Sequence, residues 1–165
     1  MTMTSLEPVL LRLAVHGDAR AISELVVALT KRWIAPDCTE DGTARLLESM
    51  ATAQVERRLG AGHLHVVAEY EGRIVGVAAL RLPSHLYYLF VADDMQRRGL
   101  ARRLWNLARA GAAPDAPITV NASLHAVEVY RRLGFEPAGA MRFEHGIRAQ
   151  PMCWLPADAD PARLR

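Results

Sequence analysis

Hydrophobic and polar positions follow each other along the chain with two different spacings, which predict where strands and helices lie. Short apolar runs rich in Val, Ile, Leu and Tyr are typical of strands. These runs lie at residues 9–13, 63–70, 73–81, 85–91, 118–121, 135–139 and 148–155. Apolar residues spaced by three or four positions predict helices at residues 19–30, 41–59, 98–110 and 124–133.

Turn and loop residues separate these stretches. Glu71-Gly72 joins two of the strand runs as a hairpin, and Gly134 ends the last helix. Residues 33–38 contain Pro36 and predict a loop, and residues 156–165 predict a loose tail. The order of elements is strand, two helices, three strands, helix, strand, helix and two strands. This order predicts an α/β fold with a mixed sheet that is parallel only where a helix crosses over.

Composition narrows the class of protein. A chain of 165 residues fits one domain, and 51% hydrophobic with 23% charged residues is typical of a globular protein and not of a disordered one. We therefore expect residues 1–165 to form a single domain. The formal net charge of +2 provides no global field that would attract nucleic acid.

The cysteines indicate whether the chain holds a disulfide framework or a metal site, and the apolar runs indicate whether it is secreted or crosses a membrane. Cys38 and Cys153 are too few and too far apart for a disulfide framework or a metal site, and no His/Cys/Asp spacing matches one. Residues 1–7 lack the basic and apolar regions of a signal peptide, and no apolar run approaches the ~20 residues that a membrane helix needs. We therefore expect a cytoplasmic protein without a bound metal or a membrane partner.

Residues 86–105 are the stretch most informative about chemistry, because a buried strand ends at Val91 and leads through a turn into a helix. Helix starts present unpaired N–H groups and a partial positive charge, which bind phosphates. Gly99 and the small Ala101 let the backbone approach a ligand closely. The arginines available for charged contacts to anionic oxygens are Arg97, Arg98, Arg102 and Arg103. The alternative is an ordinary amphipathic helix with a solvated arginine face, and the segment matches neither a Walker loop nor a Rossmann fingerprint.

The spacing Gln96-x-x-Gly99-x-Ala101 after a Leu-Phe-Val strand resembles the acetyl-CoA motif of the GNAT (GCN5-related N-acetyltransferase) superfamily, written (R/Q)xxGx(G/A). Residues 119–135 are similar to the family's TVNxS…YxxLGF block, and residues 146–152 to the closing strand of one bacterial branch. The resemblance covers most of the chain after Leu64. It implies a GNAT-type mixed, splayed central β-sheet of about six or seven strands flanked by about four helices.

The resemblance also implies that acetyl-CoA is the co-substrate and assigns residues to it. In this family the pantetheine arm pairs with the exposed backbone of one strand, which places Leu89, Phe90 and Val91 against it here. The pyrophosphate is placed on the helix start, at Gln96, Arg97, Arg98, Gly99, Leu100 and Ala101. Asn121 is implied to contact the pantetheine or a bound water, and the alternative is a turn residue that satisfies its own backbone.

Tyr130 is the residue that the resemblance assigns to catalysis. Its hydroxyl is implied to lie near the CoA sulfur and to protonate the leaving thiolate as a general acid. Helical spacing alone, with Ala126, Val129 and Leu133 on the same face, favours a core aromatic instead. A backbone N–H near Leu89 is the expected oxyanion donor.

The general base is open. His85 lies eleven residues before Gln96, the spacing at which histone-type members place a Glu, and a neutral imidazole suits that role near pH 7. A His in place of the Glu weakens the transfer of this role, and a His at a strand end is often only hydrogen-bonded. The other candidates are Glu69, His125, Tyr87 and a chain of water molecules.

The acceptor is expected to enter on the side opposite CoA, where Trp33, Asp37 and residues 141–145 are candidates to border it. The sequence thus predicts an N-acetyltransferase that moves an acetyl group to a primary amine of a small molecule or peptide by direct attack in a ternary complex. Two alternatives remain: a catalytically silent module that binds acyl-CoA, and a toxin-like enzyme that acetylates aminoacyl-tRNA. Members of the family often form homodimers, although no exposed apolar stripe demands one here.

Overall fold

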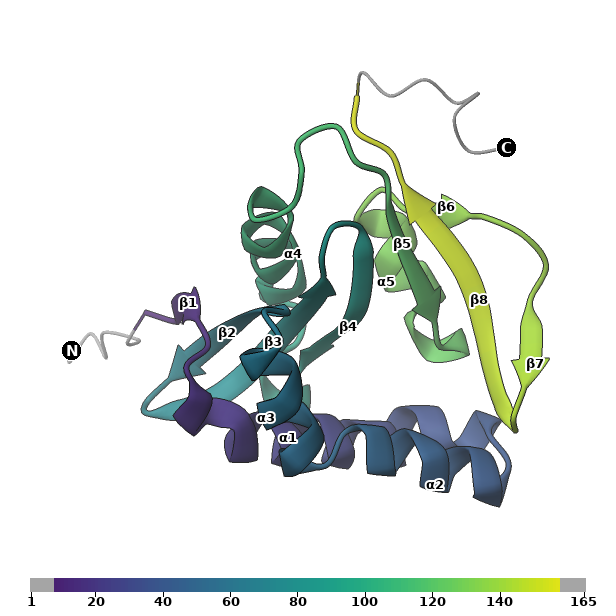
Figure 1. Cartoon of the computed structure of the whole chain (residues 1–165), viewed down its shortest axis with the longest axis horizontal. Coiled ribbons are helices and arrows are strands. Elements are labelled where there is room, and N and C mark those ends of the chain that lie inside the picture. The colour runs from purple at the N-terminus through teal and green to yellow at the C-terminus, as the bar shows by residue number, and fades with distance from the viewer. Residues whose placement is uncertain (1–7, 158–165) are drawn as a thin grey trace, which may run out of the picture.

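A mixed β-sheet forms the centre of the molecule, and helices pack against both of its faces (Figure 1). The computed structural model describes residues 8–157. Residues 1–7, in which no signal peptide is expected, and most of the tail predicted at 156–165 lie outside the described residues. Across residues 8–157, none of the helices combines the length and the apolar character needed to span a bilayer.

The bounds of the elements follow the predicted stretches closely in the strands and less closely in the helices. The strands are β1 (Leu10–Leu13), β2 (Leu64–Tyr70), β3 (Arg73–Arg81), β4 (His85–Val91), β5 (Ile118–Ala122), β6 (Glu136–Pro137), β7 (Arg142–Glu144) and β8 (Ile147–Trp154). The α-helices are α1 (Ala19–Leu29), α2 (Glu40–Ser49), α3 (Thr52–Gly60), α4 (Leu100–Ala110) and α5 (Val127–Arg132).

The strands lie in the order β1-β2-β3-β4-β5-β8-β6, and β7 pairs with the first residues of β8. Neighbouring strands are antiparallel, except that β4 and β5 are parallel. A parallel pair needs a crossover connection, and α4 lies in the segment that connects these two strands. The predicted α/β fold, with a sheet that is parallel only at a helical crossover, is confirmed.

The part of the chain that the structure describes has eight strands and five α-helices, where the sequence predicted about six or seven strands and about four helices. The additional strand is β7, which pairs with β8 through Arg142 opposite Ala149 and Glu144 opposite Ile147. The three residues of β7 are all exposed. A strand this short, with no buried face, carries no apolar alternation for sequence analysis to detect.

The additional helix arises because the helix predicted at 41–59 is wrong as one element: the chain breaks between α2 and α3. Ala51 has extended backbone angles, and the buried Met50 precedes it. The Ser23 hydroxyl of α1 donates to the Met50 carbonyl at 2.7 Å. This tertiary hydrogen bond satisfies a carbonyl that a continuous helix would have used internally.

The loop predicted at 33–38 is also wrong in part. After α1 the chain continues as a π-helical turn, Thr30–Ile34, and a 3-10 turn, Ala35–Asp37, before α2 begins. Pro36 lies near the start of the 3-10 turn, where a missing N–H does no harm. Trp33 therefore lies in a helical turn, which fixes the direction of its side chain.

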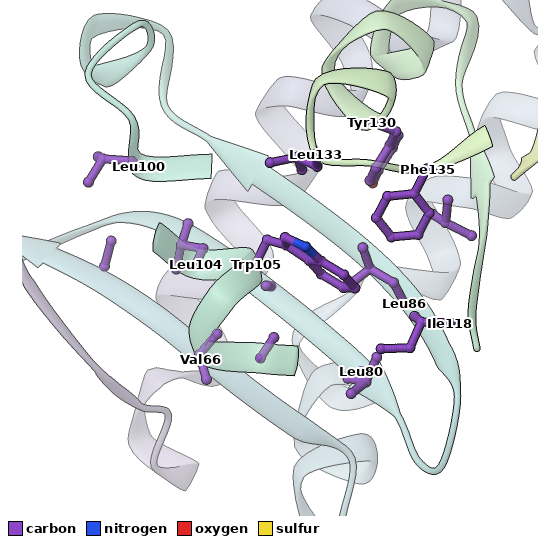
Figure 2. Close-up of a cluster of buried hydrophobic side chains, with 14 of the residues drawn as sticks. Val66, Leu80, Leu86, Leu100, Leu104, Trp105, Ile118, Tyr130, Leu133 and Phe135 are labelled. Atoms are coloured by element: carbon purple, nitrogen blue, oxygen red, sulfur yellow. The ribbon is translucent and has the colours of Figure 1, made fainter. Parts of the chain in front are cut away.

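Two hydrophobic clusters lie on opposite faces of the sheet. One contains α4 and α5 residues, including Trp105, which packs against Phe135 with ring centroids 4.8 Å apart (Figure 2). The other contains Ile22 and Val26 of α1 and Val55 of α3. The sheet is thus the middle layer of a helix–sheet–helix arrangement.

A β-bulge in β4 decides which of its side chains face each cluster. Ala79 pairs with Tyr88 and Leu80 pairs with Leu86, so Tyr87 is an extra residue without a partner in β3. Both Tyr87 and Tyr88 consequently lie on the α1–α3 side, whereas Leu86 and Leu89 lie on the α4 side.

Candidate functional site

The sheet opens between β4 and β5. These two strands pair only at His85 opposite Thr119 and Leu86 opposite Val120, and beyond this point they diverge. Residues 87–91 of β4 therefore have no strand beside them on the β5 side, and α5 follows β5 into this region (Figure 1). The splayed sheet that the sequence resemblance implied is present.

Two cavities lie at this opening. The first, of about 440 Å³, is lined by the end of β4, the segment 95–102 and the start of α5, and we call it the loop cavity. The second, of about 360 Å³, is lined by β4, α2 and the β7–β8 hairpin, and we call it the hairpin cavity. Both volumes are in the range of small-molecule sites. The residues that line both cavities are Ile34, Leu89, Phe90, Ser123, Ala126 and Tyr130.

The backbone at the start of α4 turns toward the loop cavity. Arg97 has a φ of 63° and Gly99 a φ of 78°, both in the left-handed region. Gly99 is the N-cap of α4, and no side chain accepts a hydrogen bond from the first N–H groups of that helix. A methyl group added to Gly99 would have no atom within 4 Å. The helix start is therefore open, with donors available to an anion.

Charge around the loop cavity is uniformly positive. Arg97, Arg102 and Arg132 line it, and the residues that line it include no Asp or Glu. Arg98, which the sequence also predicted as a binding residue, lines neither cavity. Gln96 supports the loop from within, because its amide donates to the Val91 carbonyl at 3.1 Å. Gln96, Gly99, Leu100 and Ala101 line this cavity.

Trp33 lies at the loop cavity and not at the hairpin cavity. Its indole N–H donates to Asp93 Oδ1 at 2.7 Å, and its ring stacks on His125 at a centroid distance of 4.5 Å. Arg32 forms an ion pair with the same Asp93 at 3.3 Å. Asp37, the other acceptor candidate of this segment, lines neither cavity.

Tyr130 of α5 lies at the boundary of the two cavities. It is 5% exposed and packs edge-on against Phe135, with ring centroids 5.4 Å apart (Figure 2). Its hydroxyl has no hydrogen-bond partner within residues 8–157. Burial raises the pKa of the Tyr130 phenol well above its ordinary value, so the side chain is protonated at neutral pH. Tyr130 is thus at once a core aromatic and a cavity residue.

His85 and Asn121 both line the hairpin cavity, and Asn121 does not reach the loop cavity. His85 Nδ1 lies 2.8 Å from the Thr119 hydroxyl, which itself donates to the Ser84 carbonyl at 3.4 Å. Because the Thr119 hydroxyl donates its proton to Ser84, its oxygen accepts from His85 Nδ1–H. Nε2 is then the unprotonated, basic nitrogen of the neutral imidazole. Burial, and then the charge of Arg81, lower the pKa of His85, so the imidazole is neutral at pH 7.

The other candidate bases lie in different surroundings. The Glu69 carboxylate is paired with Arg12 at 2.9 Å and lines neither cavity. His125 lines only the loop cavity. Tyr87 lines the hairpin cavity, but its hydroxyl accepts a hydrogen bond from Arg58 at 2.8 Å.

α2 and the β7–β8 hairpin, which both border the hairpin cavity, are in close contact at the β7–β8 turn. The Thr39 N–H donates to the Gly146 carbonyl at 2.9 Å, and a side chain at Gly42 would overlap that carbonyl. This contact brings Leu46, Ser49 and Met50 into the cavity wall. The sequence did not predict these three residues as part of a site, because a helical pattern does not indicate which distant turn the helix will contact.

Residues 34–156 match the model of the acetyltransferase (GNAT) domain family. None of the curated proteins matches the chain in sequence. A GCN5-related N-acetyltransferase from Rhodopseudomonas palustris superposes with a TM-score of 0.74 and 25% identity, over 92% of this chain and 98% of its own. Two further similar structures hold a cofactor.

The first of these, the PaiA N-acetyltransferase from Thermoplasma acidophilum in complex with coenzyme A, has a TM-score of 0.71, 13% identity, and covers 90% of this chain and 99% of its own. The second, YncA from Salmonella typhimurium with its cofactor acetyl-CoA, has a TM-score of 0.59 and 19% identity, over 93% of this chain and 97% of its own. At these identities the two structures establish the likeness of the fold.

Proposed function

Because this chain belongs to the GNAT acetyltransferase family, we propose that it transfers an acetyl group from acetyl-CoA to a primary amine of a small molecule or peptide. One observation carries the proposal. A cavity with an open, positively charged helix start and a second cavity with polar groups share a boundary, and Tyr130 lies at that boundary. Two reactants bound from opposite sides would meet there.

The charge of the loop cavity and its open helix start support coenzyme A as its ligand. The N–H groups around Gly99 and the guanidinium groups of Arg97 and Arg102 would hold the pyrophosphate, since a helix start without a capping side chain favours anions. The divergence of β4 from β5 leaves the edge of β4 along Leu89, Phe90 and Val91 without a strand beside it, so the amide groups of pantetheine could pair along that edge. Two similar folds hold coenzyme A and acetyl-CoA, which supports this cofactor for the present chain.

Acetyl-CoA supplies the acetyl group as a thioester, whose C–S bond breaks as the amine nitrogen forms the new C–N bond. A backbone N–H near Leu89 would donate to the carbonyl oxygen as negative charge develops on it. The Tyr130 hydroxyl would donate a hydrogen bond to the sulfur as the thiolate leaves. Since burial keeps this phenol protonated and it has no other partner among residues 8–157, its proton is available for that contact.

His85 would accept the proton of the amine through water. Four positions separate His85 from Leu89, and at about 3.3 Å per residue their Cα atoms lie roughly 13 Å apart, too far for direct contact with an amine at the thioester. The basic Nε2 and the lowered pKa suit a terminal acceptor at the end of a water chain. Asn121, in the same cavity, would hold one of those waters.

The proposal is tested by titrating the purified protein with acetyl-CoA and with CoA in a calorimeter, and by measuring free thiol release in the presence of amines. We expect saturable binding and amine-dependent thiol release. Absence of binding would overturn the assignment of the loop cavity. Binding without thiol release from a broad panel of amines and peptides would support a silent acyl-CoA-binding module instead.

A further inference from the structure

The wall of the hairpin cavity carries a free guanidinium group on β7. Arg142 lines the cavity and forms no hydrogen bond or ion pair with another residue in the range 8–157. Arg148 also lines the cavity, but its guanidinium lies over the ring of Phe143 at 4.7 Å. Glu144 is the only acidic residue among those that line the cavity. The cavity lining therefore carries more positive than negative charge. Of its two arginines, Arg142 is the one whose guanidinium group contacts no other side chain described above.

Strand pairing fixes the direction of these side chains. Phe143 pairs with Arg148, so both lie on one face of the hairpin, whereas Arg142 and Glu144 lie on the other. The register continues into β8, where Pro151 pairs with Asn121 of β5. Because side chains alternate, Arg142 and Asn121 share one face of the sheet, and both line the cavity.

The register also orders these groups by depth. Arg142 is opposite Ala149, two positions along β8 from the partner of Asn121, which is about 7 Å at the rise of a strand. Glu144 is opposite Ile147, a further two positions toward the turn that α2 covers. Along β8 the cation thus lies nearer to Asn121 than the carboxylate does.

We propose that the acceptor is a small amine that also carries a carboxylate, which Arg142 binds while the amine lies at the thioester. The inference rests on the proposed acetyl transfer and specifies its substrate class. A planar guanidinium binds a carboxylate in a bidentate manner, which fixes the orientation of the amine as well as its affinity. The apolar wall formed by Leu46, Met50 and Ile147 suits an apolar body on the same molecule. A polyamine would bring further cations toward Arg142, so the cavity disfavours it.

The test compares three forms of one acceptor: phenylalanine, phenylalaninamide and phenethylamine, with the same series for leucine and methionine. Spermidine serves as the cationic alternative. Thiol release is measured for the wild type, for Arg142→Gln and for the control Arg45→Gln, whose side chain is exposed on α2 and lines neither cavity. We expect the wild type to prefer at least one amino acid over its amide by roughly ten- to a hundredfold in kcat/KM, the usual range for a charged hydrogen bond.

Arg142→Gln should bring that preference close to one and leave acetyl-CoA affinity unchanged, while Arg45→Gln keeps it. Unchanged acetyl-CoA affinity also shows that the variant is folded. A preference for amides, neutral amines or spermidine, a preference that survives in Arg142→Gln, or no turnover of any amino acid would each overturn the inference. In these cases the acetyl-CoA site still stands if titration shows binding, so this failure is distinct from a failure of the proposed function.

Discussion

The indole of Trp33 lies flat on the imidazole of His125, with ring centroids 4.5 Å apart and ring planes inclined by 11°. This stack joins the helical turn after α1 to the turn before α5, across the loop cavity. The same indole donates to Asp93, at the start of the segment that leads to Gln96 and the start of α4. One side chain therefore connects three segments that must be in place for the cavity to exist.

Replacing Trp33 by Leu should weaken acetyl-CoA binding by about tenfold, because a hydrogen bond to a charged group and a stacked contact are both lost. Calorimetric titration measures the change. Trp33→Phe keeps a ring for the stack but loses the hydrogen bond to Asp93, and we expect an intermediate affinity. Equal affinity in all three proteins would show that the loop is positioned without Trp33.

Gly99→Glu should weaken acetyl-CoA binding by roughly a hundredfold or more, since it places a negative charge where phosphate would lie. The backbone strain of the substitution needs a control. Gly72 has a φ of 73° and, like Gly99, open space around it, but it belongs to the β2–β3 turn. Gly72→Glu should lower stability by a similar amount and leave binding intact. Similar affinity in the two variants would contradict the placement of the phosphates.

Tyr130→Phe should lower kcat by about a hundredfold, the lower end of the range for general acid catalysis, with little change in acetyl-CoA affinity. Stability should change little, because the hydroxyl has no partner among residues 8–157 that its removal would strand. Tyr88→Phe is the matched variant: Tyr88 is also buried, and its hydroxyl lies 3.4 Å from His65 Nε2. A loss of turnover in Tyr88→Phe as large as in Tyr130→Phe would argue against a specific role for Tyr130.

The pH dependence of kcat/KM tests His85. Its pKa is lowered by burial and by Arg81, so the neutral form persists below the ordinary histidine value near 6.5. We expect the acidic limb of the profile to lie below pH 6.5 and to disappear in His85→Gln. His145 lines the same cavity and should leave the limb in place when it is changed to Gln. An unmoved limb in His85→Gln would remove His85 as the base.

Stability should fall as the pH falls below about 6.5. The pKa of His65 is lowered in the folded protein, mainly by burial, so the unfolded chain binds the proton more tightly. Below the unfolded pKa the unfolded state holds more protons, and the free energy of unfolding decreases; above it the contribution is constant. Thermal unfolding between pH 7.5 and 5.5 measures the slope, which His65→Gln should reduce.

His16 provides the control for this experiment, since its side chain is 74% exposed. His16→Gln should keep the wild-type slope. His63 and His85 also have lowered pKa values and act in the same direction, so a part of the slope should remain in His65→Gln. An unchanged slope in His65→Gln would mean that burial of this imidazole does not drive the acid sensitivity.

Much of the fold follows from patterns among residues that are close in the sequence, so it could be predicted from the sequence. The strand and helix spacing, with Glu71-Gly72 at a hairpin and Gly134 at a helix end, predicted the order of elements and the mixed sheet. The motif from Gln96 to Ala101 and the segment around Tyr130 were sufficient to identify the family that the chain belongs to. The single-domain organisation, the cytoplasmic location and the individual catalytic roles stay predictions.

The set of elements and the family could thus be predicted, because they depend on spacing between near neighbours along the chain. The places where the elements break, and the surfaces that they face, depend on tertiary contacts. The Ser23 hydroxyl of α1 donates to the carbonyl of Met50, the residue at which α2 ends. The bulge at Tyr87 places the side chains of Tyr87 and Tyr88 on the same face of the sheet. Asn121 and Arg142 lie on one cavity wall only through the register of β5, β7 and β8. Such contacts join residues far apart in the chain, so no local pattern encodes them.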